Sequence, residues 1–224
     1  MSKLAWDAVG ERFYETGTKK GVLYLQENGV YSTGVAWNGL SAVTDSPDGA
    51  EANDIYADDI KYLSIRSAEN YKATIEAYTY PDEFAECDGS ATLVDGVTIG
   101  QQPRKPFGFS WVTTLGNDTQ YENYGYKIHL VWGATASPSE KSYQTINDSP
   151  EAVQFSWEVD TIPVAVTGHK PTAKMVIDST KLTAGKLKAI EDVLYGTDGE
   201  GASTGTAPRL PLPDEVLSII QNAT

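Results

Sequence analysis

The sequence predicts a mainly β protein, an antiparallel β-sandwich or barrel with one flanking α-helix and long loops. Three observations lead to this fold class. Eight segments are rich in β-branched and aromatic residues with partial alternation, turn-rich pieces such as 45–49 and 116–118 separate them, and one segment near the end has helical periodicity. Strands joined by short turns, without regularly interleaved helices, are typical of a sandwich or barrel.

Each predicted strand combines branched or aromatic side chains with a flanking turn signal. In the segment 71–80, Ile75 and Ala77 fall on one face while Thr74 and Glu76 fall on the other, so this strand has one solvated face. The eight predicted strands are 21–25, 34–43, 60–65, 71–80, 107–115, 124–132, 152–166 and 173–177.

The predicted helix spans about 183–195. Leu187, Ile190 and Leu194 form one apolar stripe, and Gly196 follows as a stop signal. Its lysines come early and its acids late, against the helix dipole, so we expect packing on a sheet to supply most of its stability.

The domain prediction is a β-sandwich domain over 1–196 and a flexible linker with an apolar tail over 197–224. The run 196–208 has almost no apolar side chains, which is typical of a linker or solvent loop. The following tail regains Leu, Val and Ile and must find a groove on its own domain or on a neighbour. The long loop 81–106 and the loop 45–59 are also predicted to protrude, and loops of such length are usually functional.

Composition excludes several classes of function. The chain has 224 residues with 17 Lys plus Arg and 31 Asp plus Glu, a net charge of −14, which disfavours tight nucleic-acid binding. No apolar stretch is long enough to span a bilayer and the start has no apolar signal core, so we expect a soluble chain made in the cytoplasm with no membrane partner. Cys87 is the only cysteine and cannot form an internal disulfide.

The catalytic inventory is thin. His129 lies inside a predicted strand, where a packed histidine is expected, and His169 lies in a turn, so no zinc site forms from these residues and the one cysteine. Phosphate-binding and nucleophile-elbow motifs are absent from the sequence. The prediction is therefore no catalytic residue, no cofactor and no metal; acidic loops around Asp45 and Asp54 match no EF-hand and are expected to be solvated.

One enzymatic alternative stays open. Glu76 and Glu158 lie in predicted strands near Tyr78, Tyr80 and Trp157, which would suit a carbohydrate-binding or glycoside-cleaving β-sandwich with two carboxylates. With 31 acids in the chain, two on strands beside aromatic residues are expected by chance. Core packing explains the tryptophans equally well.

Seven collinear segments spread over most of the chain have a familiar combination of strands, turns and loop anchors. They are AWDAVGERFYETG (5–17), GVLY (21–24), GVAWNGL (34–40), YADDIKY (56–62), AYTYPDEFAECDG (77–89), GQQPRKPFG (100–108) and FSWEV (155–159). Together they resemble the major tail proteins, also called tail tube proteins, of long-tailed bacteriophages and prophages. None of the segments is a catalytic signature.

The resemblance implies a structural virion protein, not an enzyme, with a β-sandwich and a flanking helix. Such proteins form hexameric rings that stack into the hollow tail tube through which DNA enters the host. The implied partners are further copies of the chain, tail-tip or initiator and tail-terminator proteins, and the tape measure protein, then DNA in the lumen without specific binding. The implied location is the virion tail, with the host cytoplasm as the place of assembly.

The negative charge suits a tube, because an acidic lumen repels the phosphates of a passing duplex. Strand parity does not say which of Glu69, Glu76, Glu122 or Glu158 faces the lumen. A capsid or decoration protein remains a third, structural alternative.

Contacts between subunits are expected from the long loop and from the apolar tail, since stacking requires segments that reach a neighbour. Alanine at Phe84 or Arg104 is expected to leave a folded monomer. For each candidate, docking within its own chain remains open. The candidate interface residues are Tyr80, Phe84, Gln101 and Arg104 in the loop and Leu210, Leu212, Val216 and Ile219 in the tail.

Overall fold

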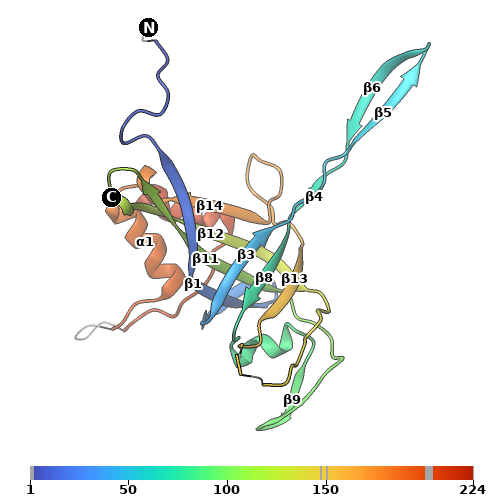
Figure 1. The fold of residues 1–224 in the computed structure, drawn as a ribbon, viewed down its shortest axis with the longest axis vertical. Coiled ribbons are helices and arrows are strands. Elements are labelled where there is room, and N and C mark those ends of the chain that lie inside the picture. Colours follow the sequence, from blue (N-terminus) through green and yellow to red (C-terminus); the bar gives the residue numbers. More distant parts are fainter. Residues whose placement is uncertain (1–2, 147, 150, 200–203, 224) are drawn as a thin grey trace.

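The computed structural model describes residues 3–146, 148–149, 151–199 and 204–223. The main sheet has eight strands that pair antiparallel in the order β2-β1-β11-β12-β13-β8-β3, with β14 also paired to β12 (Figure 1). This confirms the mainly β, antiparallel class. The strands are β1 (Phe13–Glu27), β2 (Val30–Trp37), β3 (Leu40–Asp45), β8 (Lys72–Ala77), β11 (Phe107–Asn117), β12 (Tyr121–Ala136), β13 (Phe155–Thr161) and β14 (Lys174–Asp178).

The sheet curls so that two halves face each other, and Gly133 is where β12 passes between them. Before this glycine, residues 127–131 pair with β14, and after it residues 134–136 pair with β13. Gly133 has a φ of +62°, and a Cβ there would lie 2.2 Å from the carbonyl oxygen of Ile162. Any other residue would be strained there, so glycine makes this change of partner possible.

Helices cover the outer face of one half only. Helix α1 (Ala184–Tyr195) confirms the predicted helix and begins at Thr183, whose hydroxyl accepts a hydrogen bond from the Lys186 amide. Helix α2 (Pro213–Asn222) was not predicted, although Pro213 at its start and two acids in its first turn are ordinary start signals. A short 3₁₀ turn, η2 (Ser179–Lys181), precedes α1.

Two hydrophobic cores follow from this arrangement. The inner core lies between the two sheet halves and gathers the rings of Trp37, Phe84, Phe107 and Trp157. The outer core lies between β1, β11, β12 and the helices, and contains Tyr24, Leu130, Trp132, Ile190 and Val216 among others. Alternate residues of each central strand thus enter different cores, which is why β11 and much of β12 are buried on both faces.

Several predicted loops contain strands. The segment 45–59, predicted as a loop, holds β4 (Asp48–Gly49) and β5 (Ala52–Ala57), which pair with β7 (Glu69–Asn70) and β6 (Ile60–Arg66). The predicted strand 34–43 is divided by a turn at Gly39, whose φ is +73°. The loop 81–106 contains the 3₁₀ turn η1 (Asp82–Glu86) and the hairpin of β9 (Ala91–Val94) and β10 (Val97–Ile99).

Two hairpins extend from the body at different ends (Figure 1). The β5–β6 hairpin, here called the arm, extends far from the sheet on the narrow β4–β7 stem, and the β9–β10 hairpin lies at the opposite end. The described part of the run 196–208 is not a free linker, because Thr197 and Thr206 form an antiparallel bridge and Pro208 accepts a backbone hydrogen bond from Gly34.

Candidate assembly interface

The arm is an amphipathic two-stranded ribbon. Its register pairs Ile55 with Leu63 and Ala57 with Ile60, and Ile65 follows on the same face. These side chains are solvent-exposed, with 63% of Ile60 and 46% of Leu63 accessible. An isolated hairpin in water is marginal, so an apolar face on a ribbon that leaves the body indicates a surface that another chain covers.

The opposite face of the arm bears polar and charged side chains together with the exposed Tyr56, which pairs with Lys61. The ammonium of Lys61 lies 2.8 Å from a carboxylate oxygen of Asp54, and this hydrogen bond holds the pKa of Asp54 below its ordinary value. The tip is formed by Asp58 and Asp59, both with positive φ, as a tight two-residue hairpin turn requires. The ribbon therefore has one face suited to water and one suited to contact.

The β9–β10 hairpin has one polar and one apolar cross-strand pair. Thr92 and Thr98 form a cross-strand pair, and both line a cleft of about 600 Å³ together with Tyr80 and Asp88. Val94 and Val97 form the next pair and are exposed. The threonines thus line the cleft, and the valines offer a second exposed apolar patch at the end of the molecule opposite the arm (Figure 1).

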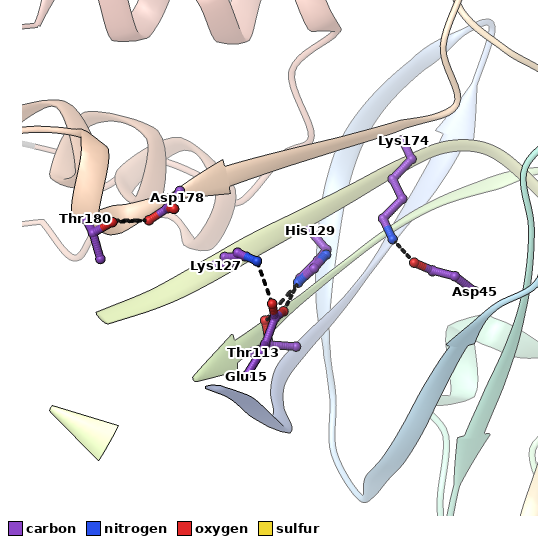
Figure 2. A network of polar contacts seen from close by, with 8 residues as sticks. All are labelled: Glu15, Asp45, Thr113, Lys127, His129, Lys174, Asp178 and Thr180. Atoms are coloured by element: carbon purple, nitrogen blue, oxygen red, sulfur yellow. Dashed lines mark hydrogen bonds and ion pairs between the residues drawn. The ribbon is translucent and has the colours of Figure 1, made fainter. Parts of the chain in front are cut away.

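A polar network crosses β1, β11 and β12 near the start of β1 (Figure 2). The Thr113 hydroxyl donates to a carboxylate oxygen of Glu15 at 2.6 Å and lies 2.9 Å from Nε2 of His129, while Lys127 donates to the other Glu15 oxygen at 2.5 Å. Burial opposes the charge on Glu15, but these hydrogen bonds outweigh it and lower its pKa. Strand β1 is thereby held in the sheet by the ion pair of Glu15 with Lys127 as well as by its backbone hydrogen bonds with β11 and β2.

His129 is the buried member of this network. Its ring stacks on Trp111 with centroids 4.8 Å apart, and its Nδ1 is buried without a hydrogen-bond partner among the described residues. Burial lowers the pKa of His129, the nearby Lys174 lowers it further, and Glu15 opposes the shift in part. This is a packed, neutral histidine, as the sequence predicts for a residue inside a strand.

A second polar contact joins the two sheet halves at the root of the arm. Lys174 of β14 forms an ion pair with Asp45, the last residue of β3, and Tyr71 donates to the same carboxylate at 2.5 Å (Figure 2 shows the ion pair). The ammonium also lies over the rings of Tyr71 and Trp111. These contacts fix the point where the chain leaves the body toward the arm.

Within the described residues, no helix lies over the outer face of β3, β8 and β13 (Figure 1). Cross-strand pairs place Glu76 beside Ser156 and Glu158 beside Thr74, so both glutamates lie on this one face. The indole of Trp157 points the other way and is fully buried in the inner core. The two carboxylates suggested for a carbohydrate site therefore share a face, but Trp157 does not form an aromatic platform beside them.

Most of the predicted interface residues dock within their own chain. Phe84, Leu210 and Val216 are buried core residues, and Tyr80 and Ile219 are half-buried against the two cores. Their position follows from chain geometry, because η1 turns the start of the long loop back onto the inner core and α2 places the tail in the outer one. For these five residues the structure favours the intramolecular alternative.

The other three predicted interface residues are not buried in either core. The Arg104 guanidinium donates to the Ala136 carbonyl at 3.0 Å and lies 3.6 Å from the Asp88 carboxylate, so it ties the long loop to the body. Gln101 and Leu212 are exposed and can still meet another chain. The apolar face of the arm was missed, although Ile55, Ile60 and Leu63 flank a two-aspartate turn in the sequence.

The described residues offer no group of three or more histidine, cysteine or acidic side chains placed to hold a metal ion. In the same part of the chain, neither helix has the length and apolar character needed to cross a bilayer. Two carboxylates of the acidic loops are already paired, Asp48 with Lys72 and Asp54 with Lys61.

Comparison with known proteins identifies no family for this chain. No protein-family model matches the chain, and no curated protein matches it. Among solved structures, a chain in the six-fold symmetrised cryo-EM structure of the anti-feeding prophage baseplate matches with a TM-score of 0.37 and 10% identity, covering 80% of this chain and 100% of that one.

Proposed function

We propose that this chain is a structural phage protein, the subunit of a tail tube in which hexameric rings stack and conduct DNA into the host. The observation on which the proposal mainly rests is the arm, whose apolar face of Ile55, Ile60, Leu63 and Ile65 has no covering partner among the described residues. The collinear sequence segments that resemble tail tube proteins support the same role.

The placement of the two apolar hairpins favours an open, head-to-tail assembly. The arm and the β9–β10 hairpin lie at opposite ends of the molecule (Figure 1), so a contact that uses both joins different surfaces of successive copies. Such a heterologous contact closes into a ring or propagates as a filament, depending on the rotation between copies. A tube of stacked rings needs one contact that closes each ring and another that propagates from ring to ring.

The helix-free face of β3, β8 and β13 is the one we assign to the lumen. Its outward side chains are polar and include Glu76, Glu158 and Asp160, with Lys72 held by Asp160 and Asp48. A polar, net acidic wall lets a polyanion slide without adhering. The opposite face, under α1 and α2, would then lie toward the outside of the tube.

The proposed partners are further copies of this chain, tail-tip or initiator and tail-terminator proteins, the tape measure protein and finally DNA, none of which needs a catalytic centre. We therefore propose no enzymatic activity. The proposed place of action is the virion tail, after assembly in the host cytoplasm.

Negative-stain electron microscopy with light-scattering mass, over a concentration and salt series, tests the proposal. Rings or tubes with six-fold end views are the expected result. If the purified chain stays monomeric, a tail-tip extract should be added as an initiator. A chain that remains monomeric with the extract and binds or cleaves glycans would contradict the tube proposal and favour the carbohydrate alternative.

A further inference from the structure

Trp6 differs from every other tryptophan of the chain. Trp37, Trp111, Trp132 and Trp157 are at most 3% exposed, whereas Trp6 is 76% exposed, with Leu4 and Val9 exposed on either side. A large apolar ring left in water in this way is unusual for a monomer. Tryptophan is also the residue most enriched where one protein anchors in another.

The segment that bears Trp6 is pinned at its base. The Gly10 amide donates to the Asp118 carboxylate at 3.0 Å, and the Asn117 side-chain amide donates to the Gly10 carbonyl at 3.1 Å. Arg12 donates to the Asp7 carbonyl at 2.9 Å. In Figure 1 the N-terminal segment leads away from the start of β1. Trp6 and Asp7 in this segment are exposed.

A cavity of about 240 Å³ lies at the start of β1 and has the chemistry to receive such a segment. Phe13, Leu115 and Tyr124 supply apolar and aromatic walls, and the rings of Phe13 and Tyr124 are 5.0 Å apart. Lys127, Lys181, Thr180 and Asp178 also line it, and the Asp178 carboxylate accepts hydrogen bonds from the amide and the hydroxyl of Thr180. Lys127 is paired with Glu15, but Lys181 has no ion-pair partner among the described residues.

We propose that Trp6 of one copy inserts into this cavity of a second copy, with Asp7 beside Lys181. The indole fits the aromatic walls and a cavity of this size, and the carboxylate of Asp7, which is without an ion-pair partner in the described part of the chain, complements the unpaired ammonium. Trp6 does not occupy the cavity of its own chain, since its ring is exposed. This inference rests on the self-assembly proposed above and assigns one of its contacts.

A peptide titration tests the contact without requiring polymerisation. A fluorescein-labelled peptide of residues 1–10 is added to the full chain carrying Trp6→Ala, and anisotropy reports binding. We expect saturable binding that weakens at least tenfold for a peptide with Trp6→Ala and for a receptor with Lys181→Glu. The matched control is Lys186→Glu, which changes the same charge on α1 outside the cavity and should leave binding unchanged.

Mixing two full-length variants distinguishes docking between copies from docking within one. Trp6→Ala removes the inserted ring, and Tyr124→Ala removes a wall of the cavity, so neither variant alone can form the contact. In sedimentation velocity, an equal mixture should form pairs that neither variant forms alone. Absence of saturable peptide binding, or equal binding to the Lys181→Glu receptor, overturns the inference. Tubes formed by the unmodified chain but unaffected by these variants would leave the proposed function standing and remove only this contact.

Discussion

Strand β12 and the arm are built from similar residues, yet they meet opposite surroundings. In β12, Ile128, Leu130 and Trp132 are fully buried between the sheet and the helices, while in the arm Ile60 and Leu63 face solvent. Alternation of apolar side chains identifies both as strands. It does not say whether the partner that covers the apolar face belongs to the same chain, and the structure answers this for β12 only.

The largest contrast is expected between Phe84 and Leu63. Phe84 is 0% exposed and its ring contacts those of Trp37, Phe107 and Trp157, so Phe84→Ala should lower the free energy of unfolding by about 3–5 kcal/mol. Leu63→Ala on the arm should stay within about 0.5 kcal/mol of the unmodified chain. Urea unfolding of dilute monomer, followed by tryptophan fluorescence, measures both.

The sequence-based prediction that alanine at Phe84 leaves a folded monomer is tested by the same measurement, and the burial of Phe84 leads us to expect a strongly destabilised one. Equal destabilisation by the two variants would mean that the arm packs on the body in solution, and the distinction between core and contact surface would be lost.

In assembly, unlike in monomer stability, we expect substitutions on the apolar face of the arm to have a large effect. Ile55→Ser with Leu63→Ser removes two apolar side chains from the contact face of the arm, which we expect to weaken subunit association by about 3 kcal/mol, or roughly 100-fold. Thermal unfolding of the monomer should be unchanged. Pelleting and electron microscopy over a concentration series measure the shift, and tubes at the normal critical concentration would remove the arm from the interface.

The pH dependence of stability provides a test of the body alone. The pKa of His129 is below its ordinary value of 6.5 because burial disfavours the charged ring, so the unfolded chain binds the proton first. Stability is therefore fully present above about pH 6.5 and falls as the pH drops below it, with a slope of at most about 1.4 kcal/mol per pH unit.

Melting curves between about pH 7.5 and about pH 5.5 measure this effect, at about 2–4 °C per kcal/mol for a chain of this size. His129→Gln should flatten the dependence, whereas His169→Gln in an exposed turn should not. Glu15 does not interfere, since its pKa is lowered below 4.5 and its contribution is lost only at more acidic pH. An unchanged slope in His129→Gln would assign the acid sensitivity to other groups.

The sequence predicts the strands of the body and α1 because their apolar and polar side chains follow the period of the element, although the strands pair with partners far away in the sequence. It fails where tertiary context decides. Phe84 stands in a run of acids, Pro and Gly that is typical of a loop, and only η1 shows that this side chain turns into the core. Helix α2 could have been found from Pro213 and the Val216, Ile219 and Ile220 spacing.

The candidate surfaces were less predictable than the fold. Segment 45–59 contains the first strand of the arm and segment 81–106 contains the β9–β10 hairpin, but the contact residues predicted within the second segment include those that anchor it to the body. Large apolar and charged side chains such as Phe84 and Arg104 are expected in both cores and interfaces, so residue type alone does not separate the two. The strand register of the arm shows which of its residues share the apolar contact face, and this register is known only from the folded structure.

The smallest effect is expected from the polar face of the arm. Lys61→Gln breaks the exposed pair with Asp54, and exposed pairs contribute little, so both monomer stability and the critical concentration should change little, the latter by less than about fivefold. This variant lies on the same ribbon as Ile55 and Leu63 and differs only in the face it alters. If it impairs assembly as strongly as the two serines do, both faces are covered in the polymer and the arm must be enclosed by a neighbour. If it does not, the arm lies against its neighbour with one face and keeps the ion-paired face in water, as its amphipathic register predicts.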